Sequence, residues 1–297
     1  MEIPTKKIKL SKETKEIILT AQTNELTEYY IYKRLAKVSK NPSNKEILNH
    51  IAEDELRHCE IWKHYTGEKV KPKKFKIWFY YFIAQFLGLT FGVKLMEKGE
   101  DMAQKNYHKL SKVVPDAEKI EREESEHENE LINLIQEQKL DYVGSMVLGL
   151  NDALVELTGA IAGLTFAFQN TNTVGIAGLI TGIAASFSMA ASEYLSKKAE
   201  GEEKTAFKAS VYTGIAYIFT VFLLVLPYFV VKNPFWALAT TLVMAVIIIF
   251  LFTFYISVAK DYNFKKRFWE MAGISLGVAA LSFIIGILIR TFLHIEI

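Results

Sequence analysis

Four segments in the second half of the chain contain no charged residue, and each is about as long as a membrane-spanning helix. They are residues 174–192, 209–231, 235–259 and 271–289. A helix needs roughly 20 apolar residues to cross the hydrocarbon core of a bilayer. A fifth segment, 142–169, is long enough but contains Asp152 and Glu156. The sequence therefore predicts five membrane-spanning helices.

Charged residues divide the chain into two parts of different character. Residues 1–140 hold 25 Lys and Arg with 23 Asp and Glu, whereas residues 141–297 hold only 10 and 10. We therefore predict an all-α protein, with a cytosolic helical domain, 1–140, followed by a transmembrane domain, 141–297. The net charge is only +2, and a nucleic-acid-binding protein would show a basic face of one sign, so we expect no nucleic-acid partner.

Basic residues between the predicted spans indicate how the chain is oriented. The connections 197–208 and 260–267 together carry eight Lys and Arg, and the connections 169–173 and 232–233 carry one. Loops rich in Lys and Arg stay on the cytosolic side. We expect a multi-pass protein of the cell membrane whose N-terminal domain lies in the cytosol. The single cysteine, Cys59, cannot form an internal disulfide and fits that reducing compartment.

A sixth apolar segment, 77–93, follows a lysine-rich stretch, 69–76. Its seventeen residues would reach only about 25 Å as a helix, which is short for a span. We expect this segment to form a helix that lies on the membrane surface. The lysines would then meet anionic headgroups, and the aromatic residues would lie at the interface.

The first 140 residues divide into four helical stretches that together predict a four-helix bundle. The stretches are 11–40, 43–65, 77–112 and 115–139. Ser11 with Thr14 and Ser43 with Glu46 stand where N-terminal caps are expected.

Two of these stretches carry the pattern Glu-x-x-His, at 55–58 and at 124–127. Residues three apart share one helix face, so each pair can offer a carboxylate and an imidazole to the same point. The stretch before each pattern carries a glutamate, Glu25 or Glu97, at a distance of one helical hairpin. Two glutamates with two such patterns are typical of di-iron and di-manganese sites. The alternative, that these are solvated glutamates and incidental histidines, is disfavoured by the mutual spacing of the set.

This part of the chain resembles the ferritin-like, rubrerythrin-type di-iron domain over about residues 12–138. The resemblance rests on YYIYKRLA after Glu25, EDELRH ending at His58 and LMEKGE around Glu97. It implies a di-iron centre, with manganese as the alternative. No Cys-x-x-Cys pair is present, so the iron–sulfur centre of a full rubrerythrin is missing. The implied ligands are Glu25, Glu55, His58, Glu97, Glu124 and His127, with Glu100 as a further carboxylate and Glu28 as a competitor for Glu25.

The spans carry ionisable residues that are unfavourable in hydrocarbon and therefore indicate an ion pathway. Asp152 and Glu156, four residues apart, share one face of the first span. Met189 and Glu193 have the same relation on the second span, and oxygen combined with sulfur suits a transition metal. In the alternative interpretation, Met189 only packs and Glu193 extends to cytosolic water.

Two segments of the membrane part, GLNDALV at 149–155 and SMAASEYLS at 188–196, are similar to signature segments of the vacuolar iron transporter family. The likeness covers residues 142–294. It implies a homodimer that moves Fe(II), or Mn(II), out of the cytosol in exchange for protons. Asp152 and Met189 fall on the family's translocation residues, and Glu156 and Glu193 are expected to be additional metal or proton sites. The whole chain thus resembles the membrane-bound ferritin type, a ferritin-like domain fused to an iron transporter.

Two classes of function remain open at this point. In the first, the protein is an iron transporter whose bundle collects or senses cytosolic Fe(II). In the second, it is a membrane-anchored di-iron oxidoreductase that oxidises Fe(II) or consumes peroxide. A manganese exporter would use the same types of ligand. Carboxylates inside the spans favour transport, because a simple anchor has no need of them.

Overall fold

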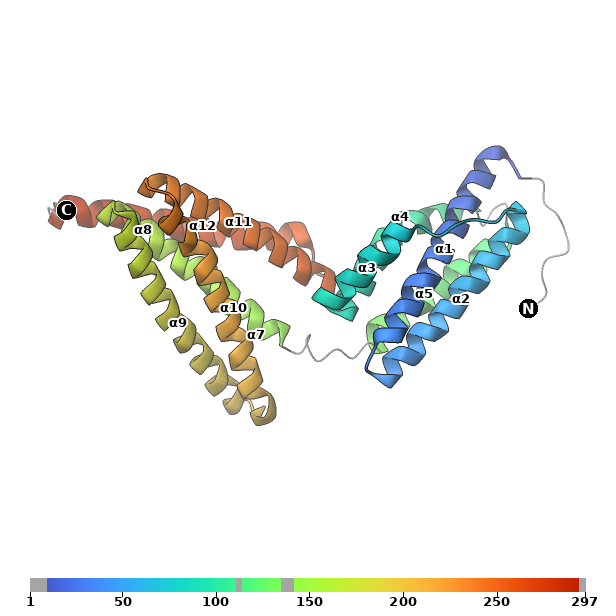
Figure 1. Ribbon diagram of the computed structural model, residues 1–297, viewed down its shortest axis with the longest axis horizontal. Helices are drawn as coiled ribbons and strands as arrows, with labels where there is room; N and C mark the ends of the chain where they lie inside the picture. The colour runs from blue at the N-terminus through green and yellow to red at the C-terminus, as the bar shows by residue number, and fades with distance from the viewer. Residues whose placement is uncertain (1–9, 111–113, 135–141, 294–297) are drawn as a thin grey trace. The chain divides into compact units, whose positions relative to one another are not determined.

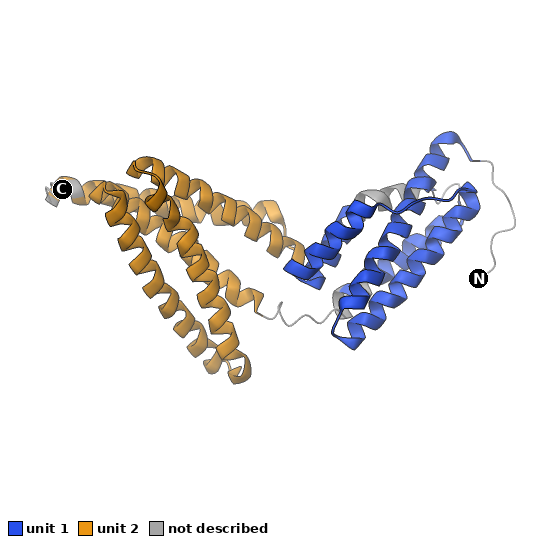
Figure 2. Cartoon of the chain, viewed as in Figure 1, with its two compact units in different colours: residues 1–137 blue, residues 138–297 orange. Residues whose placement is uncertain are grey.

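The structure is a computed structural model that describes residues 10–110, 114–134 and 142–293 (Figure 1). Within these ranges every regular element is a helix, which agrees with the predicted all-α class. The chain divides into two compact units, residues 1–137 and residues 138–297 (Figure 2).

Unit 1 contains five described helices. α1 packs along α2, α5 lies against α2 and α4, and α4 also contacts α1, so these four helices form a bundle. The shorter α3 packs against α1 and α4. That the bundle is ferritin-like remains a prediction. The helices are α1 (Lys12–Val38), α2 (Pro42–Thr66), α3 (Lys74–Leu87), α4 (Leu89–Leu110) and α5 (Asp116–Leu134).

The starts of α1 and α2 test the predicted caps. The Ser11 hydroxyl accepts a hydrogen bond from the backbone N–H of Thr14, so the first predicted cap is confirmed. The second prediction, Ser43 with Glu46, is wrong. Asn41 caps α2 by accepting from the N–H groups of residues 43 and 44, and Pro42 occupies the first turn. A residue before proline is held in an extended conformation, which is the backbone that an N-cap requires.

The predicted single stretch 77–112 is wrong, because the helix is broken between α3 and α4. Gly88 ends α3 with a φ of 106°, a conformation that side chains disfavour and glycine permits. Gly92, one turn into α4, faces Ala84 so closely that a Cβ would lie 2.7 Å from the Ala84 Cβ. α3 therefore folds back on α4 as a separate helix. Its 14 residues extend about 21 Å, too short to span a bilayer.

Unit 1 has two separate apolar clusters, one toward each end of the bundle. The first contains Ile18, Trp62 and Ile120, and the second contains Leu35, Leu48 and Leu131. On each of α1, α2 and α5, the residues between these positions include buried or half-buried acidic side chains. A polar layer thus separates the two apolar clusters.

Unit 2 contains five helices long and apolar enough to cross a membrane, which confirms the five predicted spans. α7, η1 and α8 follow one another without a break and form the first of them. The protein is therefore an integral, multi-pass membrane protein. The elements are α7 (Val143–Asp152), η1 (Ala153–Leu157), α8 (Thr158–Phe168), α9 (Thr171–Ala199), α10 (Glu203–Val230), α11 (Pro234–Ala259) and α12 (Phe264–Leu293).

The segment η1 is a π-helical turn in the middle of the first span. Such a turn is rare, because it changes the hydrogen-bond register of the backbone, and it occurs often at functional sites. Here the Ser275 hydroxyl on α12 donates to the Leu154 carbonyl oxygen over 2.7 Å. A side chain from a neighbouring helix therefore helps to satisfy the backbone of the widened turn.

α7 and α10 pack so closely that Gly149 leaves no room for a side chain, because a Cβ there would overlap the backbone oxygen of Thr213. We expect Gly149→Ala to destabilise unit 2 by about 1–3 kcal/mol, the usual effect of overpacking. Melting of the purified protein in detergent measures this. Gly144→Ala, on the same helix with no atom within 4 Å of its Cβ, is the matched control. Equal melting temperatures for the two variants would contradict the close packing.

Candidate functional site

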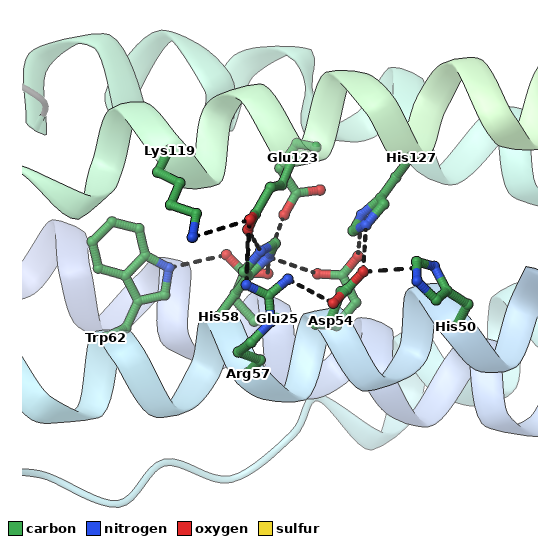
Figure 3. Close-up of polar contacts among 11 residues, drawn as sticks. Glu25, His50, Asp54, Arg57, His58, Trp62, Lys119, Glu123 and His127 are labelled. Carbon is green, nitrogen blue, oxygen red and sulfur yellow. Dashed lines mark hydrogen bonds and ion pairs between the residues drawn. The ribbon is translucent and has the colours of Figure 1, made fainter. Parts of the chain in front are cut away.

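Four side chains in the polar layer of unit 1 converge from three helices, and two of them, Glu25 and His58, are labelled in Figure 3. Glu25 comes from α1, Glu55 and His58 from α2, and Glu124 from α5. Their ligand atoms all lie within 4.8 Å of one another, and only Glu124 is not fully buried. We call these four residues the carboxylate–histidine group.

His58 lies among the three carboxylates. Its Nδ1 is 2.9 Å from Glu124 Oε1, 3.6 Å from Glu55 Oε2 and 3.8 Å from Glu25 Oε2. The indole N–H of Trp62 donates to the other oxygen of Glu25 over 3.0 Å. The group is therefore oriented by packing and hydrogen bonds from inside the bundle.

The electrostatics of this group are unfavourable without an added cation. Burial raises the pKa of Glu55 well above its usual range, and the charge of Glu124 raises it further. Burial also raises the pKa of Glu124, with a further contribution from Glu25. Burial alone would lower the pKa of His58, but its hydrogen bond with Glu124 and the nearby carboxylates of Glu25 and Glu55 raise it. One imidazolium does not balance three carboxylates, so the raised pKa values of Glu55 and Glu124 favour their protonated forms until another positive charge is added.

The donor set fits a divalent cation. Among the described side chains, Oε2 of Glu55 and Nδ1 of His127 are buried atoms that make no hydrogen bond. Carboxylate oxygens combined with imidazole suit Fe(II) and Mn(II). Cys59 is buried outside the group, and burial raises the pKa of its thiol to about 11, which leaves it an unreactive packed side chain.

Two further acidic residues hold the outer nitrogens of the histidines. Glu123 Oε2 lies 2.9 Å from Nε2 of His58, and Asp54 Oδ2 lies 3.0 Å from Nε2 of His127. Arg57 joins the two acids, with Nη2 2.6 Å from Asp54 Oδ1 and Nη1 3.1 Å from Glu123 Oε2. Burial would raise the pKa of Asp54, but hydrogen bonds from Arg57 and His127 lower it, so Asp54 is charged.

The sequence analysis missed these outer partners, although a signal for them exists. Each Glu-x-x-His pattern is immediately preceded by an acid, Asp54 in one case and Glu123 in the other. The acid before each pattern contacts the histidine of the other pattern. Asp54 of α2 contacts His127 of α5, and Glu123 of α5 contacts His58 of α2. A carboxylate on the outer nitrogen fixes the tautomer and orientation of a metal-binding histidine.

The structure places the other predicted ligands as follows. Glu28 is buried on α1 but is not in the carboxylate–histidine group, whereas its competitor Glu25 is. His127 borders the group, with Nδ1 3.6 Å from Glu55 Oε1. Glu97 and Glu100 belong to α4, but their side chains lie outside the described residues.

In unit 2, Asp152 and Glu156 lie at the start of the π-helical turn and within it. Asp152 is the last residue of α7, and Glu156 lies within η1. Their carboxyl groups interact with one another. The Tyr217 hydroxyl on α10 donates to Glu156 Oε2 over 2.9 Å. The widened turn and the residue before it thus carry a pair of carboxylates, and a buried tyrosine donates a hydrogen bond to one of them.

Glu193 on α9 is buried rather than extended to water. The Ser145 hydroxyl on α7 donates to Glu193 Oε1 over 2.5 Å, and the Thr213 hydroxyl on α10 donates to the Ser145 carbonyl oxygen over 3.0 Å. Met189, one turn before Glu193, is half-buried and packs against the apolar core of unit 2. Neither Ser145 nor Tyr217 was predicted, because hydroxyls on apolar helices are common and have no distinctive spacing.

The comparisons with known proteins bear on the membrane unit. Residues 143–206 match the model of the VIT family. The match runs from the start of α7 into α10 and includes Asp152, Glu156, Met189 and Glu193. Comparisons with curated proteins and with solved structures gave no significant match.

Proposed function

We propose that the protein is a transporter that moves Fe(II) out of the cytosol in exchange for protons, with Mn(II) as the alternative cargo. The VIT-family match over residues 143–206 and the five membrane-capable helices support transport of a metal ion across a membrane. The resemblance noted in the sequence supports iron and proton exchange. The basic connections between the spans support a cytosolic N-terminal unit.

The observation that carries this proposal is the carboxylate pair at the π-helical turn. Asp152 and Glu156 lie within a span, where ionised groups are unfavourable unless they serve a pathway or an ion. A carboxylate can hold a metal ion or a proton, and protonation weakens its hold on the metal. A higher proton concentration on the far side would therefore favour release there. The Tyr217 hydroxyl keeps the Glu156 side chain in place while Asp152 exchanges its ion.

Glu193 and Ser145 extend this path toward the cytosolic ends of α9 and α7. Lys197 and Lys198 follow Glu193 in the last turn of α9, so Glu193 lies near the predicted cytosolic surface. Its hydrogen bond from Ser145 orients one carboxylate oxygen and leaves the second available to an ion. We infer that Glu193 is the first membrane carboxylate that the ion meets.

In this proposal the carboxylate–histidine group collects the metal ion before transport. Its four side chains, with His127 beside them, would hold a divalent cation, which supplies the positive charge that two buried carboxylates and one half-buried carboxylate require. Asp54 and Glu123 orient the two imidazoles, and Arg57 keeps the two acids charged. We also propose that the protein forms a homodimer, as the family resemblance implies.

Proteoliposomes that contain the full-length protein test transport directly. With an imposed pH gradient, we expect Fe(II) or Mn(II) to accumulate in the compartment that supplies protons, and protons to move the opposite way. Competition between the two metals identifies the preferred cargo. Metal flux that is the same with and without the protein would contradict the proposal.

A membrane-anchored di-iron oxidoreductase is the second candidate, and the buried carboxylate–histidine group favours it. This function predicts repeated turnover of Fe(II) with an oxidant by the purified protein. It also predicts no metal movement into proteoliposomes. The same preparation can be used for both assays, so the two candidates give opposite results.

Loss of an outer partner should weaken metal binding without removing a ligand. We expect Asp54→Asn to lower the metal affinity of unit 1 by ~10–100-fold, because the carboxylate no longer fixes the His127 ring. Equilibrium dialysis of the chelator-treated, full-length protein against Mn(II) measures the affinity. Glu53→Gln, at an exposed neighbouring acid paired with Lys33, is the matched control. Equal affinities in the two variants would show that Asp54 does not position a metal ligand.

A further inference from the structure

α3 exposes a stripe of five aromatic side chains along one face. Their exposed fractions range from 44% to 82%. Each ring has another ring three or four residues away, so the five share one broad face of the helix. Rings four residues apart are stacked, with centroid distances of 6.0 Å, 5.7 Å and 6.4 Å for the pairs 75–79, 78–82 and 82–86. We call this set the aromatic stripe: Phe75, Trp78, Phe79, Phe82 and Phe86.

The opposite face of α3 is fixed to unit 1. Ile77 and Ala84 are only 6% and 5% exposed and belong to an apolar cluster of unit 1, and Tyr80 and Tyr81 pack against it. These contacts hold α3 in one orientation, with the aromatic stripe on its exposed face. An exposed apolar patch of this kind marks a surface that contacts a membrane or another molecule.

The surroundings of the stripe are basic. Lys69, Lys71, Lys73 and Lys74 precede or begin α3 and are exposed. The guanidinium of Arg34 on α1 lies 4.3 Å from the centre of the Trp78 ring. The sequence contains no Asp or Glu between residues 69 and 96. The surface thus combines aromatic rings with positive charge and carries no compensating acid from its own segment.

We propose that α3 docks unit 1 on a bilayer surface rich in anionic lipid, with the aromatic stripe in the interface and the lysines on the headgroups. A short amphipathic helix with aromatic and basic residues binds membranes in this way. The chain itself is held in a bilayer by five helices, so the local concentration of lipid around α3 is high. A second copy of the chain fits less well, because a symmetric contact would bring two sets of the same lysines together. This docking is separate from metal transport.

A fluorescent label on α3 tests the docking in the full-length protein. Gln85→Cys introduces an exposed thiol beside the stripe and keeps all five aromatic residues. The native Cys59 is buried and its thiol pKa is about 11, so it reacts slowly with the label. Glu60→Cys, at an exposed position on α2, is the control site. The protein is reconstituted in phosphatidylcholine vesicles with or without phosphatidylglycerol, and the lipids carry a quencher near the headgroup.

We expect strong quenching of the label at residue 85 in vesicles that contain phosphatidylglycerol, and little quenching at residue 60. Each neutralised lysine should weaken docking roughly fivefold, so the triple change Lys69→Gln, Lys71→Gln and Lys74→Gln should lower the ratio of docked to undocked protein by ~100-fold. Added salt should act in the same direction. Changing Phe82 and Phe86 to Ser should also release the label from the quencher.

Three results would overturn the proposal. The first is equal quenching at residues 85 and 60. The second is quenching at residue 85 that is unaffected by lipid charge and by the lysine changes. The third is self-quenching between labels that rises with the protein-to-lipid ratio, which would indicate that the stripe contacts a second copy of the chain.

Discussion

Replacing Asp152 with Asn should reduce metal flux in proteoliposomes to the leak of protein-free vesicles. The substitution keeps the size of the side chain but removes the negative charge that can hold either a metal ion or a proton. Because Asp152 belongs to unit 2 whereas the carboxylate–histidine group belongs to unit 1, the metal content of unit 1 should stay unchanged. Flux is followed with an entrapped metal-sensitive dye, and metal content by elemental analysis.

Glu200→Gln is the control for this result. Glu200 is an exposed acid that follows α9 and pairs with Lys197, and exposed pairs contribute little. We expect this variant to transport normally. If Asp152→Asn retained proton-coupled flux, Asp152 would have no part in the mechanism. If both variants lost flux, the effect would come from the loss of negative charge in general and not from Asp152.

The second large effect is expected for Glu55→Gln, which removes a central carboxylate of the carboxylate–histidine group. Metal affinity should fall by more than the ~10–100-fold typical of an outer partner. The metal-free variant should nevertheless melt at the same temperature as the wild type or higher. Burial and the charge of Glu124 raise the pKa of Glu55, so the unloaded carboxyl is better replaced by a neutral amide. Added Mn(II) should raise the melting temperature of the wild type and not of the variant.

Glu28→Gln provides the matched comparison, because Glu28 is also a buried glutamate of the same bundle but is outside the group. It should keep the Mn(II)-dependent rise in melting temperature. If the group were only a structural ion-pair cluster, Glu55→Gln would instead lower the stability of the metal-free protein and Mn(II) would stabilise neither protein. The two measurements therefore separate a metal site from a structural cluster.

The membrane-spanning helices could be predicted because their signal is local. An uncharged run such as 235–259 is apolar on all sides, and its helix α11 (Pro234–Ala259) follows closely. Helix ends were less certain, since both Asn41 and Ser43 are good capping residues and the extended backbone before Pro42 decides between them. The break at Gly88 was missed because an apolar run looks the same with or without a left-handed glycine.

In the candidate sites, too, the features that depend on local spacing could be predicted, and those that depend on contacts between helices could not. Glu25, Glu55, His58 and Glu124 could be grouped from their spacing on successive helices, because helical hairpins bring such positions to one level. The π-helical turn could not be predicted, because its stability depends on contacts from other helices, including the Ser275 hydroxyl more than a hundred residues later. The contacts of Asp54 with His127 and of Glu123 with His58 likewise depend on how α2 faces α5.

The position of the carboxylate–histidine group between two apolar clusters has a consequence for the proposed delivery of an ion by unit 1. Neither cluster includes a residue of the group, so each end of the bundle keeps its own hydrophobic contacts whatever the charge at mid-height. Loading and unloading then change the middle of the bundle without dismantling the fold. Under the proposed function, unit 1 would bind and release ions repeatedly while folded, whereas a domain that folds only around its metal would have to unfold at every delivery.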